Sequence, residues 1–135
     1  MILTQTNLRG FKMLRYHKKV YTILEHKELL ESITEQLNSE QWSYSEHCLD
    51  TLKYRVLDIE NVLLFIKALT LRAKNIFEYY LTDNGQAEKI CYRISYNKTQ
   101  DIILILSKDK KIISIYLNAV EDEHFTLKKE LYVQG

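Results

Sequence analysis

The chain of 135 residues contains no proline and only three glycines, so few residues force its backbone to turn. Gly85 is the one interior glycine that separates two long patterned regions. No apolar run approaches the ~20 residues that crossing a bilayer requires, and no apolar stretch follows the first charges as in a secretory signal. We therefore expect a cytoplasmic protein with no membrane contact.

Net charge, cysteine and familiar enzyme motifs are also scarce. The 19 Lys and Arg residues against 18 Asp and Glu leave a formal charge of +1, so no overall charge draws the chain to nucleic acid. Cys48 and Cys91 lack the spacing of a metal site, and we expect buried free thiols. The absence of a glycine-rich phosphate loop, GxSxG and HExxH excludes the hydrolases built on them. We expect no metal and no cofactor.

What the chain does contain is a change of apolar period near Leu71. Before it, apolar residues recur at helical spacing over 20–38, 45–55 and 59–70. After it, alternating residues over 73–81, 88–96, 101–107 and 112–118 predict strands, the first two joined by the Asn-Gly turn of TDNGQ. The order predicts an α+β fold, with N-terminal helices packed on one face of a four-stranded antiparallel sheet.

The length suits a single domain over 1–135, with a basic segment and first helix in 1–41 and a core in 42–135. The beginning of the chain is ambiguous, because it could be a strand, a short helix or a mobile arm. It is rich in cations, however, and we expect it to supply the main nucleic-acid-binding surface together with one cation of the second helix. The residues concerned are Arg9, Lys12, Arg15, Lys18, Lys19 and Arg55.

Two residues in the segment 42–135, His47 and Arg93, are candidates for a functional site. His47 shares one polar helix stripe with Thr51 and Tyr54, although a solvated helix face explains that pattern equally well. Arg93 lies on an inner-looking strand, where a guanidinium needs a phosphate, a carbonyl or an acid such as Asp101 or Asp122. We expect the remaining histidines before it, His17 and His26, to be surface residues.

The stretch EDEHFTLKKELY, residues 121–132, is the third candidate. Charged runs usually form solvated faces, and three acids beside His124 would repel RNA. Carboxylates and imidazole are also metal ligands, but consecutive residues rarely all point at one ion. The stretch is a functional site only if the chain after Asn118 folds back beside Arg93.

Three segments together resemble a known group of proteins: WSYSEHCLDTLKYRVLDIENVLLFIKAL, KICYRISYNKTQDIILILSKDKKIISIYLN and DEHFTLKKELY. The pattern of a histidine-bearing helix, a Tyr-Arg strand in a meander and a late His-x-Thr is similar to small phage and toxin-associated bacterial proteins. These resemble the broad endoribonuclease superfamily that includes barnase-like, colicin-like and RelE-like RNases. The resemblance covers about residues 42–132 and implies a RelE/barnase-like fold.

The resemblance implies cleavage of RNA without a metal, which needs a base, an acid and groups that stabilise charge on the phosphorane. His124 would be the acid or base, Arg93 the phosphate clamp, and His47 a second titrating group. Thr126 and Tyr132 would donate hydrogen bonds. One alternative is a phage or mobile-element protein that binds another protein, such as a cognate inhibitor, without catalysis. Another is a nucleic-acid-binding module led by the basic N-terminal arm.

Overall fold

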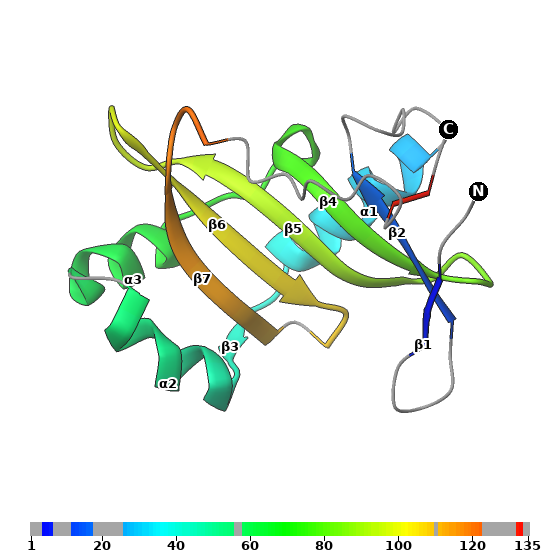
Figure 1. Ribbon diagram of the computed structural model, residues 1–135, viewed down its shortest axis with the longest axis horizontal. Helices are drawn as coiled ribbons and strands as arrows, with labels where there is room; N and C mark the ends of the chain where they lie inside the picture. The colour runs from blue at the N-terminus through cyan, green and yellow to red at the C-terminus, as the bar shows by residue number, and fades with distance from the viewer. Residues whose placement is uncertain are drawn as a thin grey trace.

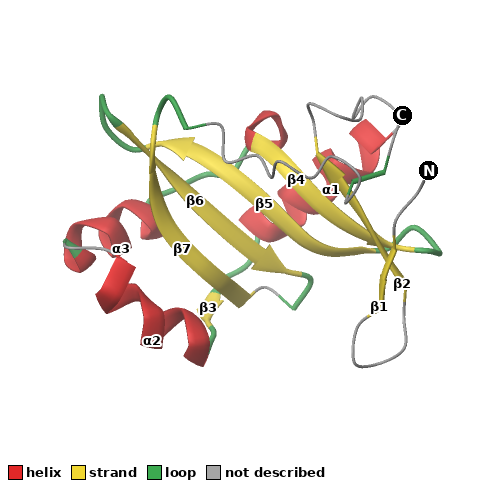
Figure 2. Ribbon diagram, in the orientation of Figure 1, coloured by secondary structure: helices red, strands yellow, loops and turns green. Residues whose placement is uncertain are grey.

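The computed structural model describes residues 4–6, 12–17, 26–55, 58–109, 111–122 and 132–133. Their helices are α1 (Lys27–Asn38), α2 (Glu46–Arg55) and α3 (Ile59–Lys67), with a 3-10 turn, η2, at Ala73–Asn75. The strands are β1 (Thr4–Thr6), β2 (Lys12–His17), β3 (Ser43–Tyr44), β4 (Ile76–Thr82), β5 (Ala87–Ser95), β6 (Gln100–Ser107) and β7 (Lys111–Ala119). The α+β character predicted from the sequence is confirmed (Figure 2).

The strands form one sheet of seven, in the order β1-β2-β4-β5-β6-β7-β3 (Figure 1). The antiparallel meander β4–β7 corresponds to the four predicted strands. The prediction that the sheet has only those four strands is wrong, because β1 and β2 extend it antiparallel at one edge and β3 extends it parallel at the other. The sheet is therefore mixed, and two strands precede the first helix.

The sequence analysis left the region of β2 open as a strand, a short helix or an arm, and it did not predict β3, for physical reasons. In β2 the apolar alternation is interrupted by charge, since KMLRYH carries Lys12 and Arg15 among its aliphatic and aromatic residues. In β3 only two residues pair with β7, too few to show any period. β2 is a strand because it pairs with β4, and β3 because it pairs with β7. Neither long-range pairing can be predicted from the local sequence.

The helix bounds agree with prediction in part. α1 ends at Asn38 as expected, and residues 20–25 of its predicted range lie outside the described residues. α2 begins after Ser45, whose hydroxyl accepts from the Cys48 backbone N–H at 3.1 Å, as a capping residue does. α3 begins after Asp58, which accepts from the Asn61 N–H at 3.4 Å, and ends at Lys67 rather than residue 70.

The main core lies between one face of the sheet and the helices. In Figure 1, α1 lies behind the sheet, whereas α2 and α3 gather at its β7 side. Each helix contributes buried apolar residues to this core: Leu30, Leu37, Cys48, Leu52, Val62 and Ile66. A hydrogen bond of 2.8 Å between the hydroxyls of Thr34 and Tyr92 joins α1 to β5.

The opposite side of the sheet carries a smaller buried cluster of Phe77, Cys91 and Ile103, against which Ile105 and Tyr116 pack. We call this side the second face. Cys91 here and Cys48 in the main core are both buried free thiols, as predicted. No helix within the described residues is long and apolar enough to cross a membrane.

The predicted hairpin turn between β4 and β5 is confirmed. Gly85 has a φ of 85°, a conformation that residues with a Cβ rarely adopt. The Gly85 N–H donates to the Thr82 carbonyl at 2.9 Å, and the Thr82 N–H donates to the Gln86 carbonyl at 2.7 Å. This turn sets the register that brings β4 and β5 side chains together on the second face.

Candidate functional site on the second face of the sheet

A carboxylate, a guanidinium and a phenol from three distant segments meet on the second face. The Nε of Arg15 in β2 donates to Glu78 Oε1 in β4 at 2.6 Å. The hydroxyl of Tyr132 donates to Glu78 Oε2 at 3.0 Å. Both carboxylate oxygens are therefore held by donors. We call these three residues with Tyr80 the Glu78 cluster.

Strand geometry brings the cluster together. The register between β2 and β4 sets Arg15 opposite Tyr80, and a bulge between Ile76 and Glu78 interrupts the pairing of β4 with β5. A bulge re-aims the side chains that follow it. Glu78 then lies opposite Cys91, which belongs to the buried cluster of the second face.

The C-terminal part of the chain reaches the same place. The Val133 backbone N–H donates to the Arg15 carbonyl at 2.8 Å, which ties this segment to β2. Val133 packs in the main core, and its neighbour Tyr132 is fully buried beside Glu78. Residues 132–133 thus lie at β2 and β4, whereas the first residues after Asn118, Ala119 and Val120, accept hydrogen bonds from Arg93. His124 and Thr126 lie outside the described residues, so the expected return of their stretch beside Arg93 stays a prediction.

Aromatic rings surround the cations of the cluster. The guanidinium carbon of Arg15 lies 4.6 Å from the ring centre of Tyr132 and 5.3 Å from that of Tyr80. The Nζ of Lys89 lies 5.4 Å from the same Tyr80 ring. A cation within about 6 Å of a ring face is attracted by the ring quadrupole. The rings therefore help to fix where these positive charges stand.

Burial shapes the electrostatics of the site. Burial alone would lower the pKa of Arg15, but its hydrogen bond to Glu78 and the charge of that carboxylate outweigh burial and raise it. Burial, and then the charge of Glu78, raise the pKa of Tyr80 and keep its phenol neutral. The same two causes raise the pKa of Cys91. Since a thiol attacks as its thiolate, Cys91 is not a nucleophile here.

Access to the cluster is narrow. The side chain of Arg15 is 16% exposed and that of Glu78 only 5%. The ring of His17 lies 5.2 Å from that of Tyr132 and 6.1 Å from that of Phe77, and His17 is itself buried. The expectation that His17 is a surface residue is wrong, because β2 lies inside the sheet between β1 and β4.

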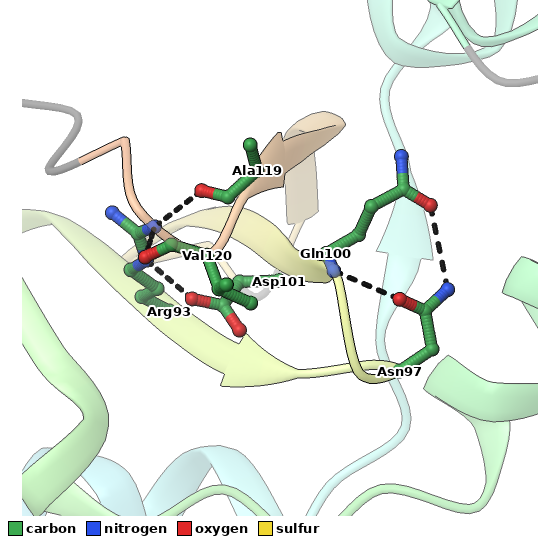
Figure 3. A network of polar contacts seen from close by, with 6 residues as sticks. All are labelled: Arg93, Asn97, Gln100, Asp101, Ala119 and Val120. Carbon is green, nitrogen blue, oxygen red and sulfur yellow. Dashed lines mark hydrogen bonds and ion pairs between the residues drawn. The ribbon is translucent and has the colours of Figure 1, made fainter.

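Arg93 lies on β5 two residues after Cys91, in a separate polar network (Figure 3). Its Nε donates to Asp101 Oδ2 at 2.7 Å, and its Nη2 donates to the carbonyls of Ala119 and Val120 at 3.0 and 3.4 Å. Of the two acids predicted as partners, Asp101 is the one that forms an ion pair with it. In Figure 3 the other terminal nitrogen of Arg93 points away from these acceptors.

The turn between β5 and β6 positions the acid of this pair. Asn97 Oδ1 accepts from the backbone N–H groups of Thr99 and Gln100 at 3.0 and 2.8 Å. A side-chain amide that mimics the backbone in this way fixes a tight turn. Asp101 follows directly and is 17% exposed, so the ion pair is held at the edge of solvent.

His47 does not contact either group within the described residues. It is exposed on α2, and Thr51, its predicted neighbour, donates its hydroxyl to the His47 backbone carbonyl at 2.9 Å. Arg55, at the end of the same helix, reaches β7, where its Nη1 donates to Ser114 Oγ at 2.6 Å. Its guanidinium carbon lies 5.8 Å from the Tyr116 ring centre. Arg55 therefore borders the second face.

His26, the other histidine expected on the surface, is half-buried beside α1, and its Nδ1 lies 2.5 Å from the Tyr79 hydroxyl.

Several predicted residues lie outside the described residues, so their roles remain predictions. They are His124 and Thr126 of the candidate catalytic set and Arg9, Lys18 and Lys19 of the basic segment. Lys12 opens β2, and the structure describes its backbone alone.

The structure thus joins two predicted residues, Arg15 and Tyr132, that the sequence assigned to different roles. It also adds Glu78, which the sequence analysis missed. The signal was a lone acid inside the aromatic strand IFEYYLT, where an unpaired carboxylate would be costly to bury.

Within the described part of the chain, no group of three or more His, Cys, Asp and Glu residues could hold a metal ion. The chain matches no protein-family model, no curated protein and no solved structure.

Proposed function

We propose that the protein is a metal-independent endoribonuclease, and that the Glu78 cluster belongs to its active site. The observation that carries this proposal is the convergence of Arg15, Glu78 and Tyr132 from the two ends and the middle of the chain. A carboxylate, a guanidinium and a phenol are together able to move protons and to stabilise negative charge without a metal.

The proposed reaction begins when the 2′-oxygen of a ribose bonds to the adjacent phosphorus while the bond from phosphorus to the 5′-oxygen breaks. Glu78 takes the 2′-hydroxyl proton, and His124, by the sequence resemblance, gives a proton to the leaving 5′-oxygen. The terminal nitrogens of Arg15 stabilise the phosphorane charge, since the ion pair with Glu78 uses its Nε. Products with a 2′,3′-cyclic phosphate and a 5′-hydroxyl follow from this chemistry.

Cations on the rest of the second face support RNA as the substrate class. Lys89 stands against Tyr80, and Arg55 stands against Tyr116 at the β7 edge. Arg93 keeps one terminal nitrogen directed away from its partners (Figure 3). Such cations contact phosphates, and partly exposed rings beside them suit unpaired bases.

Total RNA incubated with the protein in EDTA tests the proposal, because EDTA removes metal-dependent nucleases. We expect Glu78→Gln and His124→Ala each to lower cleavage by on the order of 10²-fold, the usual effect of losing a general acid or base. Glu88→Gln is the matched control, since Glu88 is an acid of β5 that pairs with Lys108 at 3.0 Å, away from the cluster. Equal cleavage by the wild type and its three variants, each shown to be folded, would reject the proposal. Absence of cleavage by all of them would reject it too.

A second candidate function is binding of another protein without catalysis, in a protein of phage or mobile-element origin. The burial of Glu78 supports the absence of catalysis, because a carboxylate that is 5% exposed and bonded at both oxygens fits a structural ion pair as well as a base. Retained folding with no RNA cleavage would leave this function as the better account.

A further inference from the structure

A groove with apolar walls lies on the helix-covered side of the sheet, away from the second face, between α3 and the segment that follows α1. Its volume is about 820 Å³, within the range of sites that bind ligands or partner side chains. Leu63 and Leu64 of α3 form one wall, and Trp42 and Tyr44 form the other. Ile112 of β7 also lines the groove.

The wall opposite α3 is fixed by the protein's own hydrogen bonds. The Asn38 side chain pairs with the backbone of Leu71 twice, donating to its carbonyl and accepting from its N–H, each at 2.8 Å. The indole N–H of Trp42 donates to the Leu37 carbonyl at 2.6 Å. These polar groups are already used, so the groove presents rings and aliphatic chains without needing to rearrange on binding.

Charges mark the two ends of the α3 wall. Glu60 lies in the first turn of α3 and Lys67 in its last turn, and both line the groove. Lys67 is seven positions after Glu60, which corresponds to about 10 Å along the axis at 1.5 Å per residue. Between them Leu64 is 64% exposed, a large apolar side chain in contact with water. Glu40 adds a third charge on the opposite wall. An occupant that is apolar in the middle and charged at both ends matches the α3 wall.

We propose that this groove docks an amphipathic segment of a partner protein, with apolar anchors against Leu64 and Trp42, a basic residue facing Glu60 and an acidic residue facing Lys67. Two apolar anchors three or four residues apart on a helical segment span about 5–6 Å and fit between the charged ends. The proposal is independent of RNA cleavage, because none of the Glu78 cluster lines the groove.

A random peptide library displayed on phage, selected on the full-length protein, tests the proposal directly. We expect enriched sequences to carry two apolar residues at helical spacing with a basic and an acidic residue at opposite ends. A synthetic peptide of that sequence should change the fluorescence of Trp42, the single tryptophan of the chain, as it binds.

Leu64→Asp should weaken binding of that peptide at least tenfold, as loss of a central apolar anchor does. Leu49→Asp is the matched control: Leu49 is 51% exposed on α2 and does not line the groove, so binding should stay within twofold. Both leucines are largely exposed, and urea unfolding should confirm that both variants keep their stability.

Exchanging the charges with Glu60→Lys and Lys67→Glu should weaken binding two- to fivefold, the scale of exposed ion pairs. A peptide with its own two charges exchanged should bind this double variant with the original affinity. Enrichment of no common sequence, or equal binding to Leu64→Asp, would overturn the proposal. A dimer of the wild-type chain that Leu64→Asp dissociates would also overturn it, because the occupant would then be a second copy.

Discussion

The ion pair between Arg15 and Glu78 should contribute more to stability than any other described pair. Its nitrogen and oxygen are 2.6 Å apart, and the two side chains are 16% and 5% exposed. Breaking a buried pair by removing one partner usually costs 3–5 kcal/mol, because the other charge stays buried without compensation. Since water still reaches part of Arg15, we expect the lower end, about 3 kcal/mol, for Glu78→Leu and for Arg15→Met.

The double variant separates this explanation from loss of packing. With both charges gone, the Tyr132 hydroxyl loses its acceptor, which costs about 1–3 kcal/mol, and the rings of Tyr80 and Tyr132 lose the guanidinium beside them. We therefore expect the double variant to lose about 3 kcal/mol rather than the sum of about 6, a coupling energy of about 3 kcal/mol. Urea unfolding followed by Trp42 fluorescence measures each value.

The pair of Lys108 and Glu88 is the internal control for this cycle. It is 3.0 Å long with side chains 39% and 15% exposed, so its coupling energy should stay below about 1 kcal/mol. Single losses under 1 kcal/mol at Arg15 and Glu78, with simple additivity in the double variant, would refute the reasoning. The Glu78 cluster would then be solvated and loosely held.

Three further predictions concern pH, the hairpin turn and RNA binding. Burial raises the pKa of Tyr92 to about 12. The contribution of its neutral phenol to the free energy of unfolding is therefore complete below the ordinary tyrosine pKa of about 10 and is lost as pH rises to 12. Absorbance at 295 nm should accordingly show several of the ten tyrosines ionising only with unfolding, and a native titration of all ten near pH 10 would contradict this. Gly85→Ala should cost about 1 kcal/mol through its φ of 85° alone, because no atom lies within 4 Å of an added Cβ, and unchanged urea unfolding would show that the turn is relaxed. Replacing Arg9, Lys18 and Lys19 with Gln should lower the salt slope of RNA affinity by about 0.7 per lost phosphate contact, whereas an unchanged slope would exclude the basic segment.

The sequence was sufficient for features decided by neighbouring residues. The meander β4–β7 follows from alternation and from the turn at Gly85, and Ser45 and Asp58 stand at the starts of α2 and α3 as capping residues do. The ion pair of Arg93 with Asp101 was also foreseeable, because the two residues are eight apart on strands joined by a short turn.

Features that depend on contacts between residues far apart in the sequence could not be predicted from it. Arg15 and Glu78 are 63 positions apart, and Tyr132 is 54 positions from Glu78. No local pattern reports which strand neighbours β2, so Arg15 was assigned to a basic surface instead of an inner ion pair. The groove beside α3 depends in the same way on how the segment after α1 packs against that helix.

Analysis of cleavage products tests the central proposal most directly. A short single-stranded RNA would be incubated with the protein in EDTA, beside the same sequence with 2′-deoxyribose at every position. If the Glu78 cluster supports attack by a 2′-oxygen, the RNA should yield fragments ending in a 2′,3′-cyclic phosphate with 5′-hydroxyl partners, and the deoxy sequence should stay intact. Cleavage of both sequences, or an intact RNA in the presence of folded protein, would contradict the proposal.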